Sequence, residues 1–385
     1  MPACTRRRVT VWTRFQMPDH DVAIIGGGLL GSAFGWGLAC AGQKAIVFDE
    51  GDAAIRTARG NFGLVWVQSK GQSMPEYAAW SLRASQLWRE FASELEDNTG
   101  VDIHYVKEGY NIVATEAELE RAILGQEKIT AGMGDNAYAF EVLDRKTLKS
   151  VAPLVADSVP GAIHTDHDGH CNPLNLMRAL HQDMQTKGTK YKPSTPVATI
   201  KPKSGGGFDL FDREGILLSS AGRVIVAAGH GSGDLVRDLG INLPVYADQG
   251  QVLVTEKVSD AFSFATGSVR QTDNGSFLLG ASSREIGLDT RTDLPTLAGV
   301  ARNCISIFPF LGNLRLQRAW GALRVMTPDG CPVYQQSETH PGLFSFACHS
   351  GVTLASVHAL EVAKWVSGGN IPSEFEVFHP RRFHV

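Results

Sequence analysis

The N-terminal part of the chain alternates short apolar runs with helical patterns, in the order that a parallel β/α arrangement requires. Residues 21–25 form a β-branched apolar run, typical of a buried parallel strand, and residues 45–48 repeat it. An apolar helical pattern covers about 29–41 and ends at Gly42, and a long amphipathic helix is expected over about 75–96. The pattern therefore predicts a strand–helix–strand unit followed by a long helix.

The rest of the chain is mostly of β type, with a few well-marked helices. These later elements are strands within 102–115, a helix over about 116–132, a helix capped by Asn172 and begun by Pro173, strands within 196–228 and 243–256, a helix over about 294–309, a strand near 314–324, and a final helix after Thr353.

A glycine motif lies between the first strand and the first helix. Gly26, Gly28 and Gly31 match G-x-G-x-x-G. The first glycine allows a tight turn, the second lets the backbone approach a pyrophosphate, and the third lets helix and strand pack closely. Leu29 and Leu30 begin the helix, whose amides and dipole attract phosphates. The motif predicts a dinucleotide site.

An acidic pair follows the second strand at the spacing that such a site needs. Asp49 lies 23 residues after Gly26, where a carboxylate accepts hydrogen bonds from a ribose. We favour Asp49 for this role, with Glu50 as a solvated neighbour. The motif alone leaves both FAD and NAD open.

The chain after Gly51 favours FAD, because it does not continue as regular β-α-β units. It is irregular over 52–71, and a later apolar strand ends in Ala-Ala-Gly at 227–229. Five segments then occur in order between about residues 20 and 370: the glycine motif, RGNFGLV (59–65), VIVAAG (224–229), WGALRVMTPDGCPVY (320–334) and FACHSGVTLASVHALEVAKW (346–365). With these segments the sequence resembles the FAD-dependent D-amino-acid oxidase and glycine oxidase family, which also contains sarcosine oxidase.

Two stretches that overlap these segments, GNFGLVWVQSKG (60–71) and CHSGVT (348–353), are most similar to the flavin subunits of heteromeric bacterial dehydrogenases that act on opines, D-hydroxyproline or glycine. The resemblance implies an α/β chain, α+β overall, with a discontinuous Rossmann-like FAD-binding domain and an inserted β-sheet substrate domain, as in glycine oxidase. We expect the FAD-binding domain at 17–98, 153–232 and 321–385, and the substrate domain at 99–152 and 233–320. Residues 1–16 are expected to be a disordered leader, with Met17 as an alternative start.

The resemblance also implies where the cofactor would bind. Ala322 stands where sarcosine oxidases carry the cysteine that attaches their flavin, which favours non-covalent FAD. Beyond the glycine motif and the acidic pair, it assigns FAD contacts to Asn61, Gly63, Leu64, Val197, Ala228, Gly229, Gly351, Val352 and Thr353.

Two residues are candidates for substrate binding. Arg324 matches the arginine that binds the substrate carboxylate in the glycine oxidase branch, and an arginine fork suits a carboxylate. The alternative is an arginine paired with Asp329 or stacked on the surface. His349 replaces a second family arginine, so it is a candidate for substrate choice; the alternative is a polar cap on the last helix.

The resemblance implies an FAD-dependent oxidoreductase that oxidises the C–N bond of a small amino acid or secondary amine. A hydride would pass to flavin N5, and the imine would be hydrolysed. The chain would be one component of a dehydrogenase, with iron–sulfur or flavin partner subunits. The alternatives are an oxidase acting alone with oxygen, a non-catalytic flavin-binding assembly subunit, and a 2-hydroxy-acid dehydrogenase.

Composition excludes several other classes. The chain has 385 residues, 43% of them hydrophobic, and a net charge of −4, which gives no basic surface for nucleic acid. No segment of 18 apolar residues predicts a membrane span. Six dispersed cysteines favour reduced thiols and a cytoplasmic location. The alternative is peripheral attachment to the inner membrane through partner subunits. No metal site is expected, and HTDHDGH (164–170) is expected to be a solvated loop.

Overall fold

The predicted N-terminal unit begins the first of two large sheets. Strand β1 is His20–Ile25, helix α1 is Leu29–Cys40 and strand β2 is Ala45–Phe48. The structure is a computed structural model that describes residues 18–51, 56–259 and 261–383. The expected leader at 1–16 and Met17 lie outside the described residues.

The first sheet has a parallel centre, with strand order β17-β18-β11-β1-β2-β8. Strand β1 lies between β11 and β2 and runs parallel to both, and β11 also runs parallel to β18. Strands β9 and β10 extend the sheet from β11 in antiparallel fashion. The remaining bounds are β8 Lys190–Lys192, β9 Thr199–Pro202, β10 Phe208–Phe211, β11 Leu217–Val226, β17 Val333–Gln336 and β18 Leu343–Ala347.

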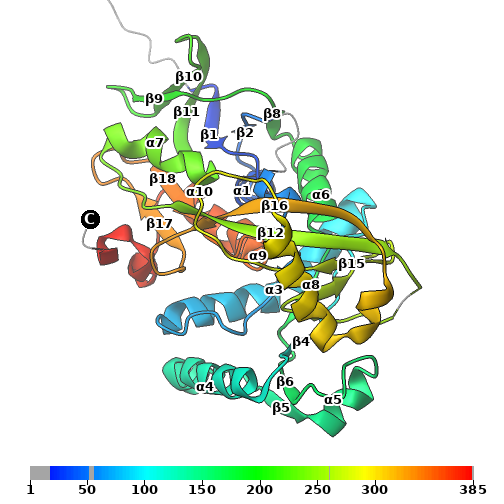
Figure 1. Cartoon of the computed structure of the whole chain (residues 1–385). Helices are drawn as coiled ribbons and strands as arrows, with labels where there is room; N and C mark the ends of the chain where they lie inside the picture. The colour runs from blue at the N-terminus through cyan, green and yellow to red at the C-terminus, as the bar shows by residue number, and fades with distance from the viewer. Residues whose placement is uncertain (1–17, 52–55, 260, 384–385) are drawn as a thin grey trace, which may run out of the picture.

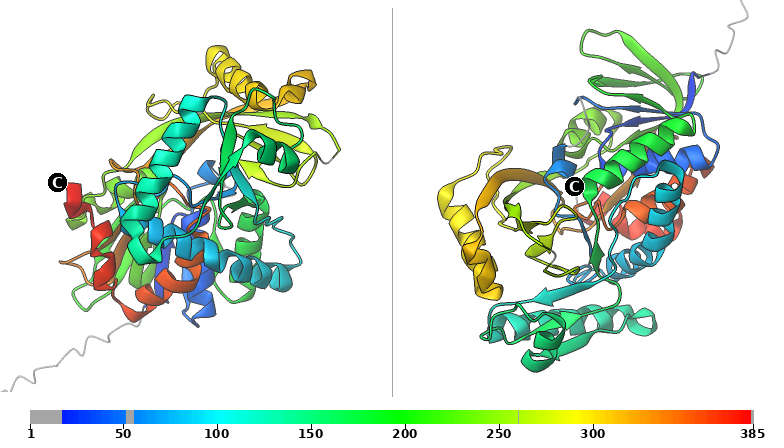
Figure 2. Two further views of the ribbon diagram at one scale, coloured as in Figure 1. Left: turned by 90° about the horizontal axis from the view of Figure 1, so that it is seen from below. Right: turned by 90° about the vertical axis from the view of Figure 1, so that its right-hand side faces the viewer.

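Both faces of this sheet are covered, which explains why β1 and β2 are continuous apolar runs. On one face, Val22, Ile24 and Val47 belong to a core shared with helices from both ends of the chain. Figures 1 and 2 show the last helices, in red and orange, beside the blue α1. Besides α1, the helices on this face are α3 Pro75–Thr99, α6 Pro173–Thr186, α9 Ala355–Val357 and α10 Ala363–Gly368, with the π-helical turn His358–Val362 before α10. On the other face, Ala23 and Ile25 pack with β9, β10 and helix α7 (Ser232–Val236).

The second sheet is mixed and largely antiparallel, with strand order β16-β12-β15-β14-β13-β4-β6-β5. Its strands are β4 Gly109–Ile112, β5 Glu141–Asp144, β6 Gly161–His164, β12 Tyr246–Lys257, β13 Ala265–Thr266, β14 Val269–Gln271, β15 Ser276–Leu279 and β16 Leu316–Met326. Helices α4 Glu116–Met133, α5 Arg145–Val151 and α8 Leu294–Ile307 accompany it.

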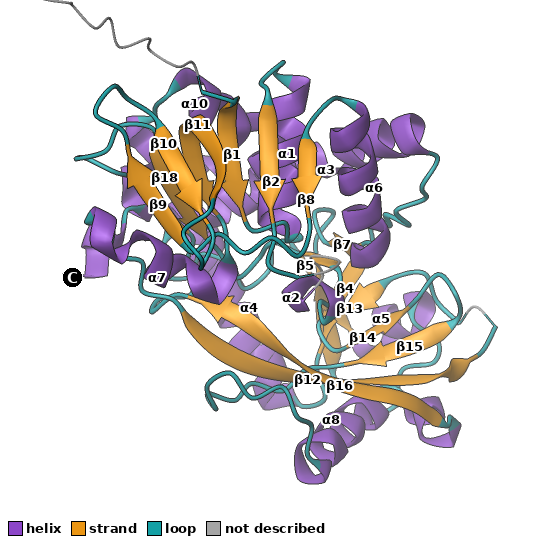
Figure 3. Ribbon diagram, turned by 90° about the horizontal axis from the view of Figure 1, so that it is seen from above, coloured by secondary structure: helices purple, strands orange, loops and turns teal. Residues whose placement is uncertain are grey.

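Helix α8 covers one face of this sheet, where Leu253 and Phe277 pack with Val300 and Ile307. The opposite face of β12 and β16 is turned toward the first sheet, as Figure 3 shows. Helix α2 (Arg56–Arg59) and the small sheet of β3 (Leu64–Val65) with β7 (Gly169–His170) lie between the two large sheets. The two sheets therefore enclose the segments that carry most of the predicted site.

Two strands cross the domain boundaries expected from the sequence. Strand β6 pairs with β4 and β5 in the second sheet, although 153–232 was assigned to the other domain, and β16 continues past the boundary at 320/321 to Met326. Strand pairing connects residues that are distant in the sequence and that no local pattern relates. A domain boundary placed from the sequence alone therefore could not take these pairings into account. The division into domains stays a prediction.

Candidate functional site

The glycine motif has the local geometry that a dinucleotide needs. A Cβ on Gly26, whose φ is +103°, would lie 2.3 Å from the carbonyl oxygen of Ala227, and one on Gly31 would lie 1.8 Å from that of Gly26. Gly28 instead has no atom within 4 Å of an ideal Cβ. Packing therefore requires glycine at positions 26 and 31, whereas Gly28 leaves open space at the start of α1. The residues fit the pyrophosphate of a dinucleotide.

Asp49 ends β2 beside this motif. Its carboxylate accepts hydrogen bonds from the amides of Gly27 (2.8 Å) and Gly51 (2.7 Å). Glu50 is exposed, as expected. The strand end therefore places one carboxylate, Asp49, next to the phosphate-binding turn.

Three other predicted cofactor segments converge on the same edge of the first sheet. Ala228 lies against Gly26, with its Cα 2.8 Å from an ideal Cβ there, and Gly229 follows with a φ of +58°. Gly351 lies against α1, where an ideal Cβ would be 3.9 Å from the Cβ of Leu29. Buried Val197 follows a turn whose amides, at residues 194 and 195, bond to the carbonyls of residues 51 and 49.

The 59–65 segment, which we call the flavin loop, is tied to the last turn of the chain. Asn61 accepts a hydrogen bond from the amide of Gly63 (2.7 Å), and Gly63 has a φ of +87°. The Thr353 hydroxyl accepts a bond from the amide of Trp66 (3.1 Å) and donates to the carbonyl of Leu64 (3.3 Å). Val352 and Thr353 are buried, so the side chain of Thr353 holds the loop in place.

The flavin loop also touches the second sheet, on the face opposite α8. An ideal Cβ on Gly60 would lie 2.0 Å from the Cβ of Ala322. The Phe62 ring is 3.0 Å from an ideal Cβ on Gly280. These contacts define a face of β12, β14, β15 and β16, which we call the loop-facing sheet surface. The predicted cofactor segments and the second sheet therefore meet here.

Arg324 lies on the loop-facing sheet surface. Its Nη1 forms an ion pair with Asp248 (2.5 Å) and donates to the carbonyl of Ser282 (2.9 Å). The guanidinium lies over Gly250, where an ideal Cβ would be 2.6 Å from Nη2. The alternative pairing with Asp329 is wrong, because that carboxylate binds Arg382 (2.7 Å). One side of the Arg324 fork is engaged through Nη1. Among the described residues, no acceptor takes a hydrogen bond from its Nη2 or Nε, so these donors remain for a ligand.

Lys70 is a group that the sequence interpretation missed. It lies beyond the end of β3 and of the flavin loop, and it is only partly exposed. Burial lowers the pKa of its ammonium from 10.5 to about 8, with Asp168 opposing this shift and the positive charge of Arg324 adding to it. A lysine in a polar loop carries no periodic signal, so its position became visible only when the fold brought it near Arg324.

Asp168 supports the segment that leads to Lys70. Its carboxylate accepts bonds from the amide of Val67 (2.6 Å) and from the amide and side chain of Gln68 (3.4 and 2.7 Å). Burial raises the pKa of Asp168 to about 7, against the effect of these hydrogen bonds. Asp168 therefore fixes the backbone immediately before Lys70.

The expectation that 164–170 forms a solvated loop is wrong. Asp168 and His170 are buried, because β7 pairs with β3 and draws this segment between the two sheets. His170 donates a 2.7 Å hydrogen bond from Nε2 to the carbonyl of Ser263. In the described part of the chain, no three His, Cys, Asp or Glu side chains come together as metal ligands.

His349 joins the same cluster from the turn after β18. Burial first, and then the charges of Lys70 and Arg324, lower the pKa of His349 to about 3. The ring is therefore neutral near pH 7, and it can act as a hydrogen-bonding group rather than as a charge. Its neighbour Ser350 accepts a bond from the Tyr77 hydroxyl (2.7 Å), and burial raises the pKa of the Cys348 thiol to about 12.

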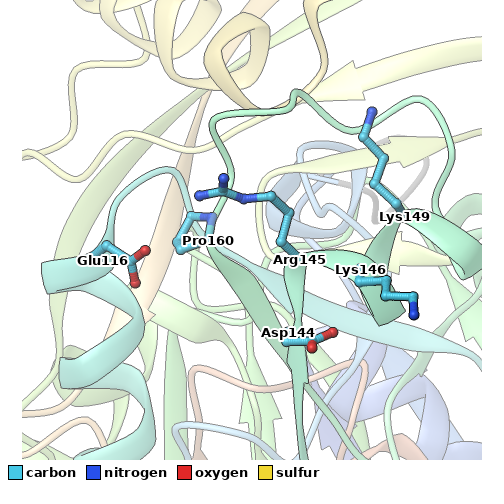
Figure 4. A pocket seen from close by; sticks show the side chains of 6 residues that line it. All are labelled: Glu116, Asp144, Arg145, Lys146, Lys149 and Pro160. Carbon is cyan, nitrogen blue, oxygen red and sulfur yellow. The ribbon is translucent and has the colours of Figure 1, made fainter.

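A surface hollow is formed by other residues than those of this cluster. It is formed at α4 and α5 by Glu116, Asp144, Arg145, Lys146, Lys149 and Pro160, as Figure 4 shows. Several of its polar groups have structural partners: Asp144 caps α5 through the amide of Thr147, and Lys149 binds Asp157 (2.9 Å). This hollow holds none of the predicted site residues.

Taken together, a βαβ glycine turn and a second sheet that closes over a basic cluster define the class of two-sheet flavin-dependent oxidoreductases. A family model described as "FAD dependent oxidoreductase" (DAO) matches residues 21–365. The chain belongs to this family, and the predicted family, fold class and FAD-dependent oxidoreductase activity are confirmed.

Individual relatives resemble the chain over nearly its whole length. The B subunit of opine oxidase from Agrobacterium tumefaciens (strain Ach5) is 39% identical over 96% of this chain and 99% of the relative. The protein of the same name from Rhizobium meliloti is 38% identical over 95% and 98%. The crystal structure of glycine oxidase from Geobacillus kaustophilus has the same fold, with a TM-score of 0.84 at 24% identity over 94% of this chain and 98% of that one. No helix among the described residues is long and apolar enough to cross a membrane.

Proposed function

We propose that this chain is the FAD-containing subunit of a heteromeric dehydrogenase that oxidises the C–N bond of a small amino acid or secondary amine. The observation that carries the proposal is the cluster of Arg324, Lys70 and His349 beside the flavin loop. The two relatives named as opine oxidase subunits support both the C–N substrate and a heteromeric assembly with further subunits. Substrates of the opine, D-hydroxyproline, sarcosine or glycine type belong to this class.

The cofactor would be bound by the segments that meet at the edge of the first sheet. Gly26, Gly28 and Gly31 would hold the pyrophosphate and Asp49 the ribose, while Asn61 and the turn at Gly351 would flank the flavin. Bound FAD supplies a two-electron acceptor for the C–H bond next to nitrogen.

The residues near that site support non-covalent attachment of FAD. Ala322, which packs against Gly60, offers no nucleophile. Burial raises the pKa of the Cys331 thiol to about 11 and that of Cys348 to about 12, so both thiols stay protonated. The five described cysteines are free thiols, which fits a reducing compartment such as the cytoplasm.

The protein groups would orient the substrate and manage its proton. The free donors of Arg324 would bind the substrate carboxylate, which holds the carbon next to nitrogen in a fixed place. Lys70, with its pKa near 8, can accept the proton of a substrate ammonium at Nζ, because it is neutral in a useful fraction of molecules above neutral pH. His349 would donate or accept one hydrogen bond as a neutral ring. The resulting imine leaves for hydrolysis by water, which gives an oxo product and an amine.

The test is anaerobic reduction of the protein-bound flavin, followed by its absorbance. Purified protein, alone and with its partner subunits, is mixed with glycine, sarcosine, D-proline, D-hydroxyproline and opines, and with 2-hydroxy acids for comparison. We expect bleaching by at least one amine and by no hydroxy acid. Bleaching by hydroxy acids alone, or by nothing, would disprove the proposed function.

Two further measurements separate the alternatives. An Arg324→Ala variant that keeps full activity in the complex would favour a non-catalytic role for this chain. Reoxidation of the reduced protein by oxygen as fast as by an artificial acceptor would favour an oxidase that acts alone.

A further inference from the structure

His181 is a residue of α6 that contacts the backbone of the glycine motif. Its Nε2 lies 3.1 Å from the carbonyl oxygen of Gly27 and 2.9 Å from the hydroxyl oxygen of Ser32, a buried residue of α1. The Ser32 hydroxyl donates a hydrogen bond to the same carbonyl (2.9 Å). Side chains from two helices therefore converge on one backbone oxygen, and none of the roles assigned above uses either of them.

The Gly27 carbonyl decides which ring nitrogen of His181 carries the hydrogen. A carbonyl oxygen can only accept, so we assign the hydrogen to Nε2, which then donates to it. Burial lowers the pKa of His181 from 6.5, against the opposing effects of the Gly27 carbonyl and the charge of Asp49, so the ring is neutral near pH 7. The Tyr191 ring packs against it with centroids 4.5 Å apart. His181 is therefore a fixed, neutral donor.

The peptide between Gly27 and Gly28 connects this carbonyl to an amide on its opposite side. The peptide is trans, so the C=O of Gly27 and the N–H of Gly28 point in opposite directions. Among the described residues, no acceptor takes a hydrogen bond from the Gly28 amide, and no atom lies within 4 Å of an ideal Cβ on Gly28. Holding the carbonyl inward therefore turns a free amide outward at the start of α1.

A peptide between two glycines needs such a support. Glycine adopts backbone angles that other residues avoid, so a Gly-Gly peptide can rotate at little cost. The preceding peptide is held by Asp49, which accepts a hydrogen bond from the Gly27 amide (2.8 Å). Rotation of the Gly27–Gly28 peptide would turn a carbonyl oxygen outward in place of an amide, and that oxygen would repel a phosphate.

We propose that His181 is a positioning residue for FAD: together with Ser32 it holds the Gly27 carbonyl, so that the Gly28 amide is presented to the pyrophosphate. His181 touches no reacting group and acts through the backbone of the glycine motif. The inference rests on the FAD binding proposed above at this motif, and it does not depend on the substrate.

The test measures the dissociation constant of FAD for the apoprotein by fluorescence titration. His181→Met and His181→Gln introduce side chains of similar size, of which only glutamine retains an N–H donor. We expect His181→Met to weaken FAD binding at least about tenfold and His181→Gln to stay within about threefold of wild type. Gln182→Leu, exposed on the same helix, is the control and should bind FAD like wild type. If His181→Met does not fold, Ser32→Ala removes the other donor and should weaken FAD binding in the same direction.

The phosphorus NMR spectrum of bound FAD separates a displaced pyrophosphate from a general loss of affinity. At saturating FAD, His181→Met or Ser32→Ala should shift the pyrophosphate resonances, whereas His181→Gln and Gln182→Leu should reproduce the wild-type spectrum. Weaker binding with unchanged resonances, or an equal loss of affinity in His181→Gln and His181→Met, would reduce His181 to a packing residue and overturn the inference. If His181→Met and Ser32→Ala bind FAD like wild type while amines bleach the wild-type flavin, the proposed function stands and this inference alone falls.

Discussion

Lys70 shows how the environment of one residue changes its chemistry. Its ammonium lies close enough to Arg324 and Asp168 to be affected by both charges, and burial is the largest cause of its lowered pKa. Near pH 8 such a lysine exchanges a proton readily, which an exposed lysine with a pKa near 10.4 does not.

We therefore expect the rate of flavin reduction by amines to rise as the pH increases through about 8. In Lys70→Met this limb of the pH–rate profile, the rise near pH 8, should be absent. The rate should rise with pH because only the neutral form of Lys70 can accept a proton, and the fraction of this form grows as the pH increases. Stopped-flow reduction between pH 6 and 10 measures this. Lys128→Met, an exposed lysine on α4, should behave like wild type. A limb near pH 8 that persists in Lys70→Met would assign it to another group.

His358 is a buried residue whose effect concerns stability. It is 0% exposed, its Nε2 is 2.7 Å from the Tyr334 hydroxyl, and burial lowers its pKa from 6.5 to about 3. The folded protein keeps this ring neutral, whereas the unfolded chain protonates it below pH 6.5. Its contribution to stability is therefore present above pH 6.5 and is lost as pH falls from there toward about 3.

Lowering the pH from 7 to 5 should cost about 2 kcal/mol of unfolding free energy through His358 alone, from a pKa of 6.5 in the unfolded state. Urea denaturation of wild type and His358→Gln at pH 7 and pH 5 measures the contribution of His358 to this change in unfolding free energy. The difference between the two pH values should be about 2 kcal/mol smaller in the variant. An identical pH dependence in both proteins would contradict the prediction.

At the scale of elements, the turn between β1 and α1 separates glycines needed for folding from one needed for the ligand. Gly26 is confined by the Ala227 carbonyl and has a positive φ, whereas Gly28 faces open space with an ordinary φ of −69°. Alanine at Gly26 is therefore strained and crowded, while alanine at Gly28 meets nothing of the protein.

Gly28→Ala should leave the unfolding free energy of the apoprotein within about 1 kcal/mol of wild type and weaken FAD binding at least about tenfold. Gly26→Ala should instead destabilise the apoprotein itself, by about 1–3 kcal/mol. Urea unfolding of apoproteins and fluorescence titration with FAD give the two quantities. Unchanged FAD affinity in Gly28→Ala would show that the pyrophosphate lies elsewhere.

The elements themselves were largely predictable from sequence, and their partners were not. The helix expected to begin at Pro173 does so, with Asn172 accepting bonds from the amides of Leu174 and Asn175, because capping is a local property. Asp168 looked like part of a solvated loop, since its burial depends on pairing between β3 and β7, about a hundred residues apart. Lys70 was missed for the same reason: only the fold gives it its surroundings.

For the whole molecule, cofactor binding should stabilise both sheets together. The proposed FAD segments come from residues 26–31, 61–64 and 351–353, which lie at the junction of the two sheets. A ligand that binds only the folded chain raises its stability by mass action.

FAD at one hundred times its dissociation constant should raise the unfolding free energy by about 2.7 kcal/mol. Thermal scans of apoprotein with increasing FAD, monitored by tryptophan fluorescence, test this. Gly28→Ala should show a much smaller rise at the same FAD concentrations. Two separate transitions, with only one responding to FAD, would show that the sheets unfold independently.

The bond between Thr353 and the backbone of Trp66 joins positions 287 residues apart. During synthesis the flavin loop is made early, but its Thr353 anchor emerges from the ribosome only when the chain is nearly complete. Until then, the segment before Lys70 is held by earlier residues such as Asp168 and the carbonyl of Ile163, which accepts a bond from the Gln68 side chain. A nascent chain shortened before residue 353 therefore lacks a finished cofactor site, and FAD capture becomes one of the last events in the production of this protein.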